Sequence, residues 1–261
     1  MQDKFILLIF AEENLINLKN SNIMALVFKH KNALHVITLG TTSNAKIEGD
    51  KKRKIVQTYT YSEKQYQLVL DSLKSGLSIG MANFFSVADT NCLDCPFNEY
   101  GKCYTHKFNQ YCGFTSSLRS IAKKYGDLEN IPTFDLSILN ELIKMSTNTY
   151  VRFGSYGEPS LHPIEMIKGM VNVCNNWTGY THQWEKQNLG DYFMASTHTI
   201  NEEQTAKNKG YRSFVATPTK LNFVSCPASK ESGYKATCST CGLCSGTLGT
   251  KSKKSIEIIL H

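Results

Sequence analysis

The sequence lacks the long apolar runs that form membrane-spanning helices. No stretch of its 261 residues approaches about 18 consecutive apolar residues, so we expect no membrane partner. The opening segment MQDKFILLIF has only a short apolar run before Glu12 and Glu13, which predicts a buried strand rather than a signal peptide. We therefore expect a cytoplasmic protein, in whose reducing surroundings thiols stay free or bind metal.

The sequence also lacks a repeat of fixed period and a linker rich in proline and serine, so nothing divides the chain into separate modules. Its nine cysteines are an odd number, which argues against a disulfide framework. The 41% of hydrophobic residues is enough to bury a core. The net charge of +7 is modest, and lysines gather at residues 51–54 and 251–254. These lysine-rich loops either contact nucleic-acid phosphates or are simply solvated.

The first half of the chain combines strands with helices. Apolar runs at residues 4–10, 23–30, 33–39 and 54–61 predict strands. Ser62 and Gln65 form a capping-box pair, which predicts a helix from Ser62 to Leu73 that Gly76 stops. Residues 77–113 hold four cysteines and no clean period, so we expect a long loop organised by a ligand.

From Thr149 onward, strands and helices alternate, which is typical of βα units in a largely parallel sheet. Asn201 is expected to cap a short helix in this half. We predict the α/β class, with a partial or complete parallel (β/α) barrel-like domain, extra N-terminal strands and cysteine-rich metal-binding loops. Residues 1–60 would form a β-rich segment packed on the main domain, and residues 61–261 a single compact metal-binding unit.

Four cysteines in the segment CPASKESGYKATCSTCGLC suggest a metal centre. Three of them follow one another in steps of three, and a Cys-Pro pair lies upstream. Closely spaced cysteines with a remote Cys-Pro are typical of ferredoxin-type 4Fe–4S sites, whereas zinc sites usually combine two separate Cys-x2-Cys turns. Zinc and unligated thiols remain the alternatives. The predicted ligands are Cys226, Cys238, Cys241 and Cys244.

A second group lies in CLDCPFNEYGKCY, with Cys92, Cys95 and Cys103 as predicted ligands. Three cysteines without a fourth leave a coordination position open for chemistry. Alternatively, His106 or Cys112 closes the site and makes it structural.

Polar candidates follow several predicted strands, at the edge where parallel α/β folds carry their active sites. The GSYGEP segment contains two glycines that let backbone amides approach a ligand. For each of these residues, a turn, core or surface role is the competing interpretation. The candidate catalytic residues are Arg152, Tyr156, Glu158, His182 and His198, and the candidate cofactor-binding residues are Gly154, Gly157, Asn44 and Lys46.

The motifs SNAKIEGDKKRKIVQTY, CLDCPF, VRFGSYGEP, TGYTHQW, MAST, GYRSFV, CPASKESG, CGLCSG and KSIEIILH occur in this order. Over residues 42–261 the chain resembles a family of phage- and plasmid-borne proteins related to the phage gene-product-88-like proteins, a family without an assigned reaction. The resemblance implies a bacterial host cell as the location. It also implies that the seven predicted ligands belong to the family pattern, whereas Cys112 and Cys174 do not.

The chain is also similar to radical S-adenosylmethionine enzymes, which join a three-cysteine loop to a Gly-Glu-Pro-like turn and a C-terminal auxiliary cluster. This likeness implies S-adenosylmethionine as a cofactor near GSYGEP. The spacing departs from that family, because the cysteines here are separated by two and then seven residues.

Two functions follow from these features. The leading hypothesis is a mobile-element iron–sulfur enzyme that acts on an unidentified small-molecule or nucleic-acid substrate at the carboxyl ends of the strands. The alternative is a zinc-stabilised nucleic-acid-binding protein of phage or plasmid replication, in which the lysines bind the nucleic acid.

Overall fold

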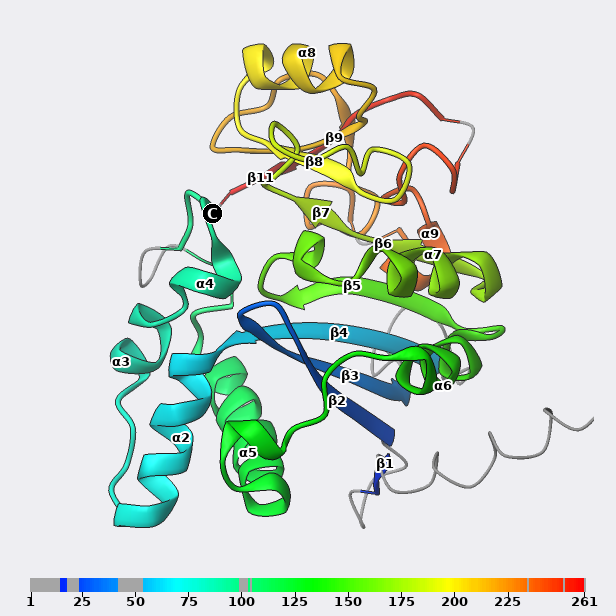
Figure 1. The fold of residues 1–261 in the computed structure, drawn as a ribbon. Coiled ribbons are helices and arrows are strands. Elements are labelled where there is room, and N and C mark those ends of the chain that lie inside the picture. The colour runs from blue at the N-terminus through cyan, green and yellow to red at the C-terminus, as the bar shows by residue number, and fades with distance from the viewer. Residues whose placement is uncertain are drawn as a thin grey trace, which may run out of the picture.

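A computed structural model describes residues 15–17, 24–41, 54–98, 103, 105–233, 235–250 and 252–260 (Figure 1). The predicted strand at residues 4–10 and the candidates Asn44 and Lys46 lie outside these ranges.

The first sheet has six strands in chain order. The first four pair antiparallel as a meander, and the last three pair in parallel. They are β1 (Leu15–Asn17), β2 (Met24–His30), β3 (Ala33–Thr41), β4 (Lys54–Ser62), β5 (Tyr150–Tyr156) and β6 (Asn176–Thr178).

The second sheet has five parallel strands in the order β10-β11-β9-β8-β7. They are β7 (Tyr180–Thr181), β8 (Met194–Thr197), β9 (Ser213–Thr217), β10 (Val224–Ser225) and β11 (Ile256–Ile259). Only Gly179 separates β6 from β7, and its carbonyl accepts a hydrogen bond from the Met194 amide at 3.0 Å. The two sheets therefore continue into one another through this interrupted strand (Figure 1).

This arrangement confirms the predicted α/β class and its parallel strands. The described strands form an open series from β1 to β10 and do not close into a barrel. Because β4 pairs in parallel with β5, the N-terminal strands extend the main sheet.

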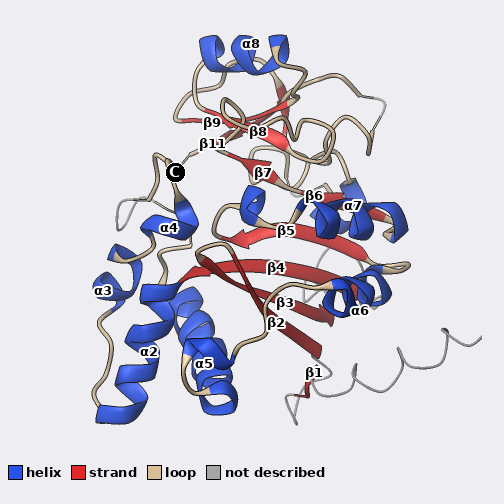
Figure 2. Cartoon of the chain, in the orientation of Figure 1, coloured by secondary structure: helices blue, strands red, loops and turns tan. Residues whose placement is uncertain are grey.

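Helices cover both faces of the first sheet (Figure 2). α2 and α5 pack with residues of β2–β4 in one apolar cluster, and α6 and α7 pack on the opposite face. None of the described helices is long and apolar enough to cross a bilayer. The helices are α2 (Glu63–Ser75), α3 (Met81–Ser86), α4 (Asp89–Cys92), α5 (Phe108–Tyr125), α6 (Leu136–Ser146), α7 (Ile164–Val173), α8 (Ile200–Asn208) and α9 (Cys238–Cys241), with 3-10 turns η1 (Leu128–Asn130) and η2 (Pro159–Leu161).

Local sequence signals explain several helix ends. The capping box of Ser62 and Gln65 starts α2 as predicted, and Gly76 stops it with a φ of 73°. Two predictions are corrected. Residues 77–113 contain α3, α4 and the start of α5 in place of one long loop. α8 is capped by the Thr199 hydroxyl, which accepts from the Glu202 amide, and Asn201 lies within the helix.

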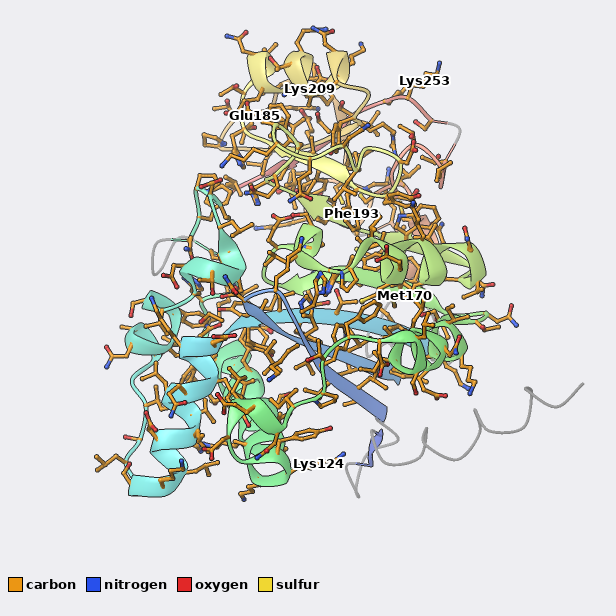
Figure 3. The ribbon with its side chains drawn as sticks, in the orientation of Figure 1. Lys124, Met170, Glu185, Phe193, Lys209 and Lys253 are labelled. Carbon is orange, nitrogen blue, oxygen red and sulfur yellow. The ribbon has the colours of Figure 1, made fainter. Side chains whose placement is uncertain are left out.

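The core lies between these helices and the sheet. Met170 of α7 and Phe193 before β8 are fully buried in one apolar cluster, whereas Lys124 and Lys209 lie at the surface (Figure 3). Fully burying a side chain of this size contributes about 1.5–3 kcal/mol. This packing fixes the carboxyl ends of the parallel strands, where the candidate site lies.

Candidate functional site

The turn after β5 brings the backbone unusually close to β4. Gly157 has a φ of 77°, and a Cβ atom there would lie 2.0 Å from the Thr60 hydroxyl oxygen. Only glycine fits this position without displacing β4. The close approach lets the Glu158 amide donate to the Asn91 carbonyl at 2.7 Å.

The Glu158 carboxylate is the centre of the site. Its side chain is buried, with 3% of the residue exposed. One oxygen accepts the Ser160 amide at 3.1 Å, and the other accepts the His182 amide at 3.0 Å. Glu158 thus joins the turn after β5 to the first residue after β7.

His182 lies between an acid and a thiol. Its Nδ1 is 3.8 Å from a Glu158 carboxylate oxygen, and its Nε2 is 3.8 Å from the Cys95 sulfur. Burial alone would lower the pKa of His182, but the interactions with Cys95 and Glu158 outweigh it and raise the pKa to about 9. His182 is therefore protonated at neutral pH.

His198 stacks beside His182 but is neutral, whereas His182 is charged. The two ring centroids are 5.8 Å apart, and Phe97 presents its edge to both rings. His198 Nδ1 lies 3.1 Å from the Ala216 carbonyl, which can only accept, so Nδ1 carries the proton. The buried Nε2 has a free lone pair and no hydrogen-bond partner among the described residues. Burial lowers the pKa of His198, and protonated His182 lowers it further.

The first cysteine group begins at the end of α4, which packs against β4. Asn91 is fully buried, and its amide nitrogen donates to the Thr60 carbonyl at 2.9 Å. Between the first two cysteines, Asp94 forms an exposed ion pair with Lys186 of the loop after β7. These contacts hold the cysteine segment against Glu158 and His182.

The cysteines of this group affect one another electrostatically. The pKa of the Cys92 thiol is raised first by burial and then by Cys95, Cys103 and Glu158. Burial also raises the pKa of Cys103. Of the two residues that could close the site, His106 packs against Phe85 with ring centroids 4.0 Å apart and planes tilted by 31°, and Cys112 is exposed on α5.

The C-terminal cysteines have different surroundings. Cys226 follows β10, and α9 begins and ends at Cys238 and Cys241. Cys244 is packed in an apolar cluster with Met194 and Ile256. Burial raises the pKa of Cys244, and the other three cysteines raise it further, which places the four thiols in one neighbourhood.

In the described ranges, no three His, Cys, Asp or Glu side chains are arranged so that they could hold a metal ion. Metal binding at either group therefore requires the sulfurs to come closer together than they stand here. That either group binds a metal stays a prediction.

The five candidate catalytic residues are divided among three places. Glu158, His182 and His198 lie together at the carboxyl edge. Tyr156 is packed in the core below, where its hydroxyl lies 2.6 Å from the Gln65 amide nitrogen. Arg152 lies in the neighbourhood of Cys238, whose pKa it lowers against the effect of burial.

A buried hydrogen-bonded chain supports the turn after β5, and no sequence pattern predicted it. The Gly154 amide donates to the Thr58 hydroxyl at 2.9 Å, and this oxygen is 2.7 Å from His162 Nε2. His162 Nδ1 is 2.8 Å from His35 Nδ1, and His35 Nε2 is 3.3 Å from the His30 carbonyl. Because that carbonyl can only accept, one assignment satisfies every member: His35 donates to it, His162 donates to His35, and Thr58 donates to His162.

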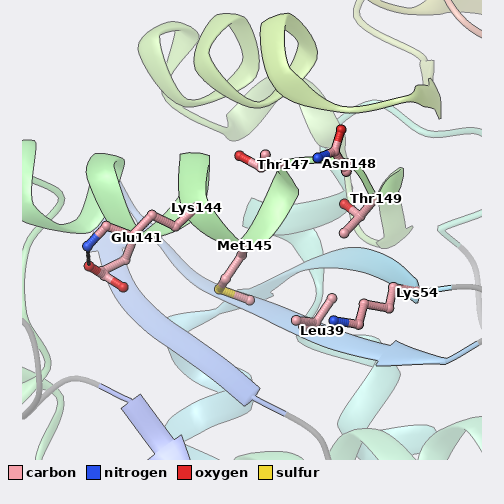
Figure 4. A pocket seen from close by; sticks show the side chains of 8 residues that line it. All are labelled: Leu39, Lys54, Glu141, Lys144, Met145, Thr147, Asn148 and Thr149. Atoms are coloured by element: carbon pink, nitrogen blue, oxygen red, sulfur yellow. Dashed lines mark hydrogen bonds and ion pairs between the residues drawn. The ribbon is translucent and has the colours of Figure 1, made fainter.

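A cavity of about 380 Å³ lies away from this chemistry, at the amino ends of β4 and β5 (Figure 4). Lys54, Met145 and Thr149 are among its lining residues, and its ion pair joins Lys144 to Glu141. The acid–base groups Glu158, His182 and His198 and the first cysteine group are at the opposite ends of these strands, so we place the functional site there.

No family model matches the chain, and the searches of curated proteins and solved structures also found no match.

Proposed function

We propose that the protein is a metal-dependent enzyme, most simply an iron–sulfur enzyme, that works at the carboxyl ends of β4, β5, β7 and β8. In this proposal the open parallel sheet serves as a partial-barrel scaffold. One observation carries it: the buried Glu158 carboxylate fixes His182, whose ring is 3.8 Å from the Cys95 sulfur. A predicted metal-binding thiol, an imidazolium and a carboxylate therefore meet at the edge where parallel α/β enzymes carry their sites.

The donor set fits the proposed group. Cys92, Cys95 and Cys103 would hold the cluster, and thiolates are the ligands that iron–sulfur clusters use. The raised pKa values of Cys92 and Cys103 keep these thiols protonated until a cation displaces the protons. When bound, a cluster held by three thiolates supplies electrons and one iron open to a further ligand.

The protein's own residues provide the proton chemistry. His182 carries a proton at neutral pH, and neutral His198 presents a lone pair at Nε2. Phe97 makes T-shaped ring contacts with both histidines. The two rings therefore place a proton donor and a proton acceptor side by side at the carboxyl edge.

The test is metal analysis of the full chain purified without oxygen. Iron, zinc and acid-labile sulfide are measured with the visible spectrum for the wild type, for Cys92→Ser/Cys95→Ser/Cys103→Ser and for Cys226→Ser/Cys238→Ser/Cys241→Ser/Cys244→Ser. We expect iron and sulfide in the wild type and a partial loss in each variant. In the C-terminal variant, the remaining electron paramagnetic resonance signal should shift when S-adenosylmethionine is added, because only an open iron responds to a ligand.

Zinc without sulfide in all three proteins would overturn the proposal. The zinc-stabilised nucleic-acid-binding alternative would then predict binding to DNA that weakens steeply with salt. In that case Lys253→Gln/Lys254→Gln should reduce the salt dependence relative to Lys124→Gln on α5, a matched control away from that loop.

The same geometry favours a second candidate function, covalent catalysis by a thiol. Cys95, His182 and Glu158 follow one another as thiolate, imidazolium and orienting carboxylate do in thiol enzymes. Iodoacetamide labelling separates the two functions. A thiol enzyme should show alkylation of Cys95 faster than that of exposed Cys112, slowed in His182→Gln and unaffected by added iron or zinc. Under the metal proposal, the added metal protects Cys95.

A further inference from the structure

Arg212 is a buried cation beside the C-terminal cysteines. It precedes β9, and only 4% of the residue is exposed. One terminal nitrogen donates to the Leu243 and Ser245 carbonyls, each at 2.8 Å, and the other donates to the Lys254 carbonyl at 3.1 Å. The guanidinium is thus hydrogen-bonded to the backbone on both sides of Cys244.

This cation has no carboxylate partner among the described residues. Its three hydrogen bonds all go to neutral carbonyls, and its Nε is buried without an acceptor. The one electrostatic neighbour that favours its charge is the Cys244 thiol. Moving an uncompensated charge out of water is costly, so buried arginines are ordinarily paired.

We propose that Arg212 is the counter-cation of a negatively charged metal–thiolate centre formed by Cys226, Cys238, Cys241 and Cys244. Four thiolates around Zn²⁺ carry a net charge of about −2, as do four thiolates around an oxidised 4Fe–4S cluster. Such a centre supplies the negative charge that compensates Arg212, which neutral thiols do not. Arg212 is then a positioning residue that orients the Cys244 backbone and stabilises the thiolate form. This inference rests on the metal-binding role that the sequence predicts for the C-terminal group.

The test measures Zn²⁺ affinity by chelator competition on the reduced full chain. Cys92→Ser/Cys95→Ser/Cys103→Ser is the background, so that only the C-terminal group binds. Removing residues that support metal ligands typically lowers metal affinity roughly 10- to 100-fold. We expect Arg212→Gln to lose affinity in this range. Arg212→Lys should lose less affinity, because it removes the same guanidinium hydrogen bonds but keeps the positive charge. Arg119→Gln, an exposed arginine on α5, is the matched control and should bind as the background does.

The melting temperature of each variant is also measured with and without Zn²⁺, so that a change in metal-free stability is subtracted. If Arg212→Gln and Arg212→Lys lose equal affinity, the charge role is wrong. If Arg212→Gln binds as tightly as the background, the whole inference is wrong while the metal site stands. If the background itself binds no Zn²⁺, no thiolate centre forms there, and both the proposed role of this group and the inference are overturned.

Discussion

The two cysteine groups offer the same sulfur ligands in different electrostatic surroundings. Around the first group, Cys95 contacts His182, and burial together with the Glu158 carboxylate raises the pKa of Cys92. Around the second, burial raises the pKa of Cys238 against the effect of Arg152, burial and Glu231 raise that of Cys226, and Arg212 donates to backbone carbonyls beside Cys244. The first group lies beside the acid–base residues Glu158 and His182, whereas the second has two arginines nearby.

This difference separates two roles. Cations stabilise thiolates and so favour a tightly held, permanent centre. A carboxylate beside a thiol has the opposite effect and favours a centre whose ligands and protons exchange. We infer that a metal at the second group stabilises the fold and that the first group carries the reaction.

The largest expected effect tests this separation directly. Cys241→Ser should lower the melting temperature of the metal-loaded protein by about 10 °C or more, because metal-binding free energy becomes folding free energy. Cys95→Ser should change it by only about 3 °C, since the first group lies at the edge of the sheet. Scanning calorimetry before and after chelation measures both. Equal shifts in the two variants would remove the distinction between the groups.

The second prediction compares a glycine beside each group. Gly157→Ala should destabilise the protein by about 3 kcal/mol, because the new Cβ atom strikes the β4 backbone and the left-handed conformation is strained. Gly242→Ala should cost about 2 kcal/mol, because the atom in its way is the side-chain end of Asn176, which can move.

Urea unfolding measures these differences. Gly210→Ala is the control, since its φ is 84° and no atom lies within 4 Å of the added Cβ, so about 1 kcal/mol of strain remains. A cost at Gly157 no larger than this control would mean that the turn does not press on β4.

The third prediction concerns pH. Burial lowers the pKa of His35 to about 3 and holds that of His162 well below its usual value. Below pH 6.5 the unfolded chain therefore binds more protons than the folded one. The stability from this pair is complete above pH 6.5 and is lost as pH falls toward 3. Between pH 7 and 5.5 the loss is about 1 kcal/mol per histidine.

Hydrogen exchange locates the effect. Residues 199–260 contain no histidine, so acid should loosen residues 154–162 before residues 238–245. In urea unfolding, His35→Gln/His162→Gln should show a flatter pH dependence than the wild type. An unchanged pH dependence would show that other groups cause the acid sensitivity.

The smallest expected effect tests whether an ion pair or a buried hydrogen bond holds the first cysteine segment in place. Lys186→Gln should change the free energy of unfolding by less than about 0.5 kcal/mol, because its ion pair with Asp94 is exposed. Asn91→Ala should cost about 2 kcal/mol, because it removes a buried side-chain donor to the Thr60 carbonyl. Chemical denaturation compares them, and the reverse order would mean that the ion pair anchors the segment.

Local patterns predicted much of the fold. Apolar runs gave β2 to β4 nearly to the residue, and the Ser62–Gln65 pair and Gly76 marked both ends of α2. The short helices α3 and α4 could not be predicted, since they are too short for a period and depend on packing against β4 and α2. Whether the strands close into a barrel also depends on long-range pairing.

The site was predictable where position after a strand was the signal. That signal identified Glu158, His182 and His198, which the structure brings together. It could not exclude Arg152 from the acid–base cluster, because strand-end reasoning does not say which face of β5 a side chain occupies. Asn91 and Arg212 were missed because their partners are backbone carbonyls about 30 residues or more away along the chain.

Gly179 gives the two cysteine groups a mechanical connection. Its amide donates to the Cys244 carbonyl at 3.2 Å, and its lack of a side chain admits the Phe193 ring, which would lie 2.5 Å from a Cβ atom. Three residues of extended chain, about 10 Å, lead from this point to His182. One hydrogen bond and this short segment therefore link the backbone of Cys244 to His182.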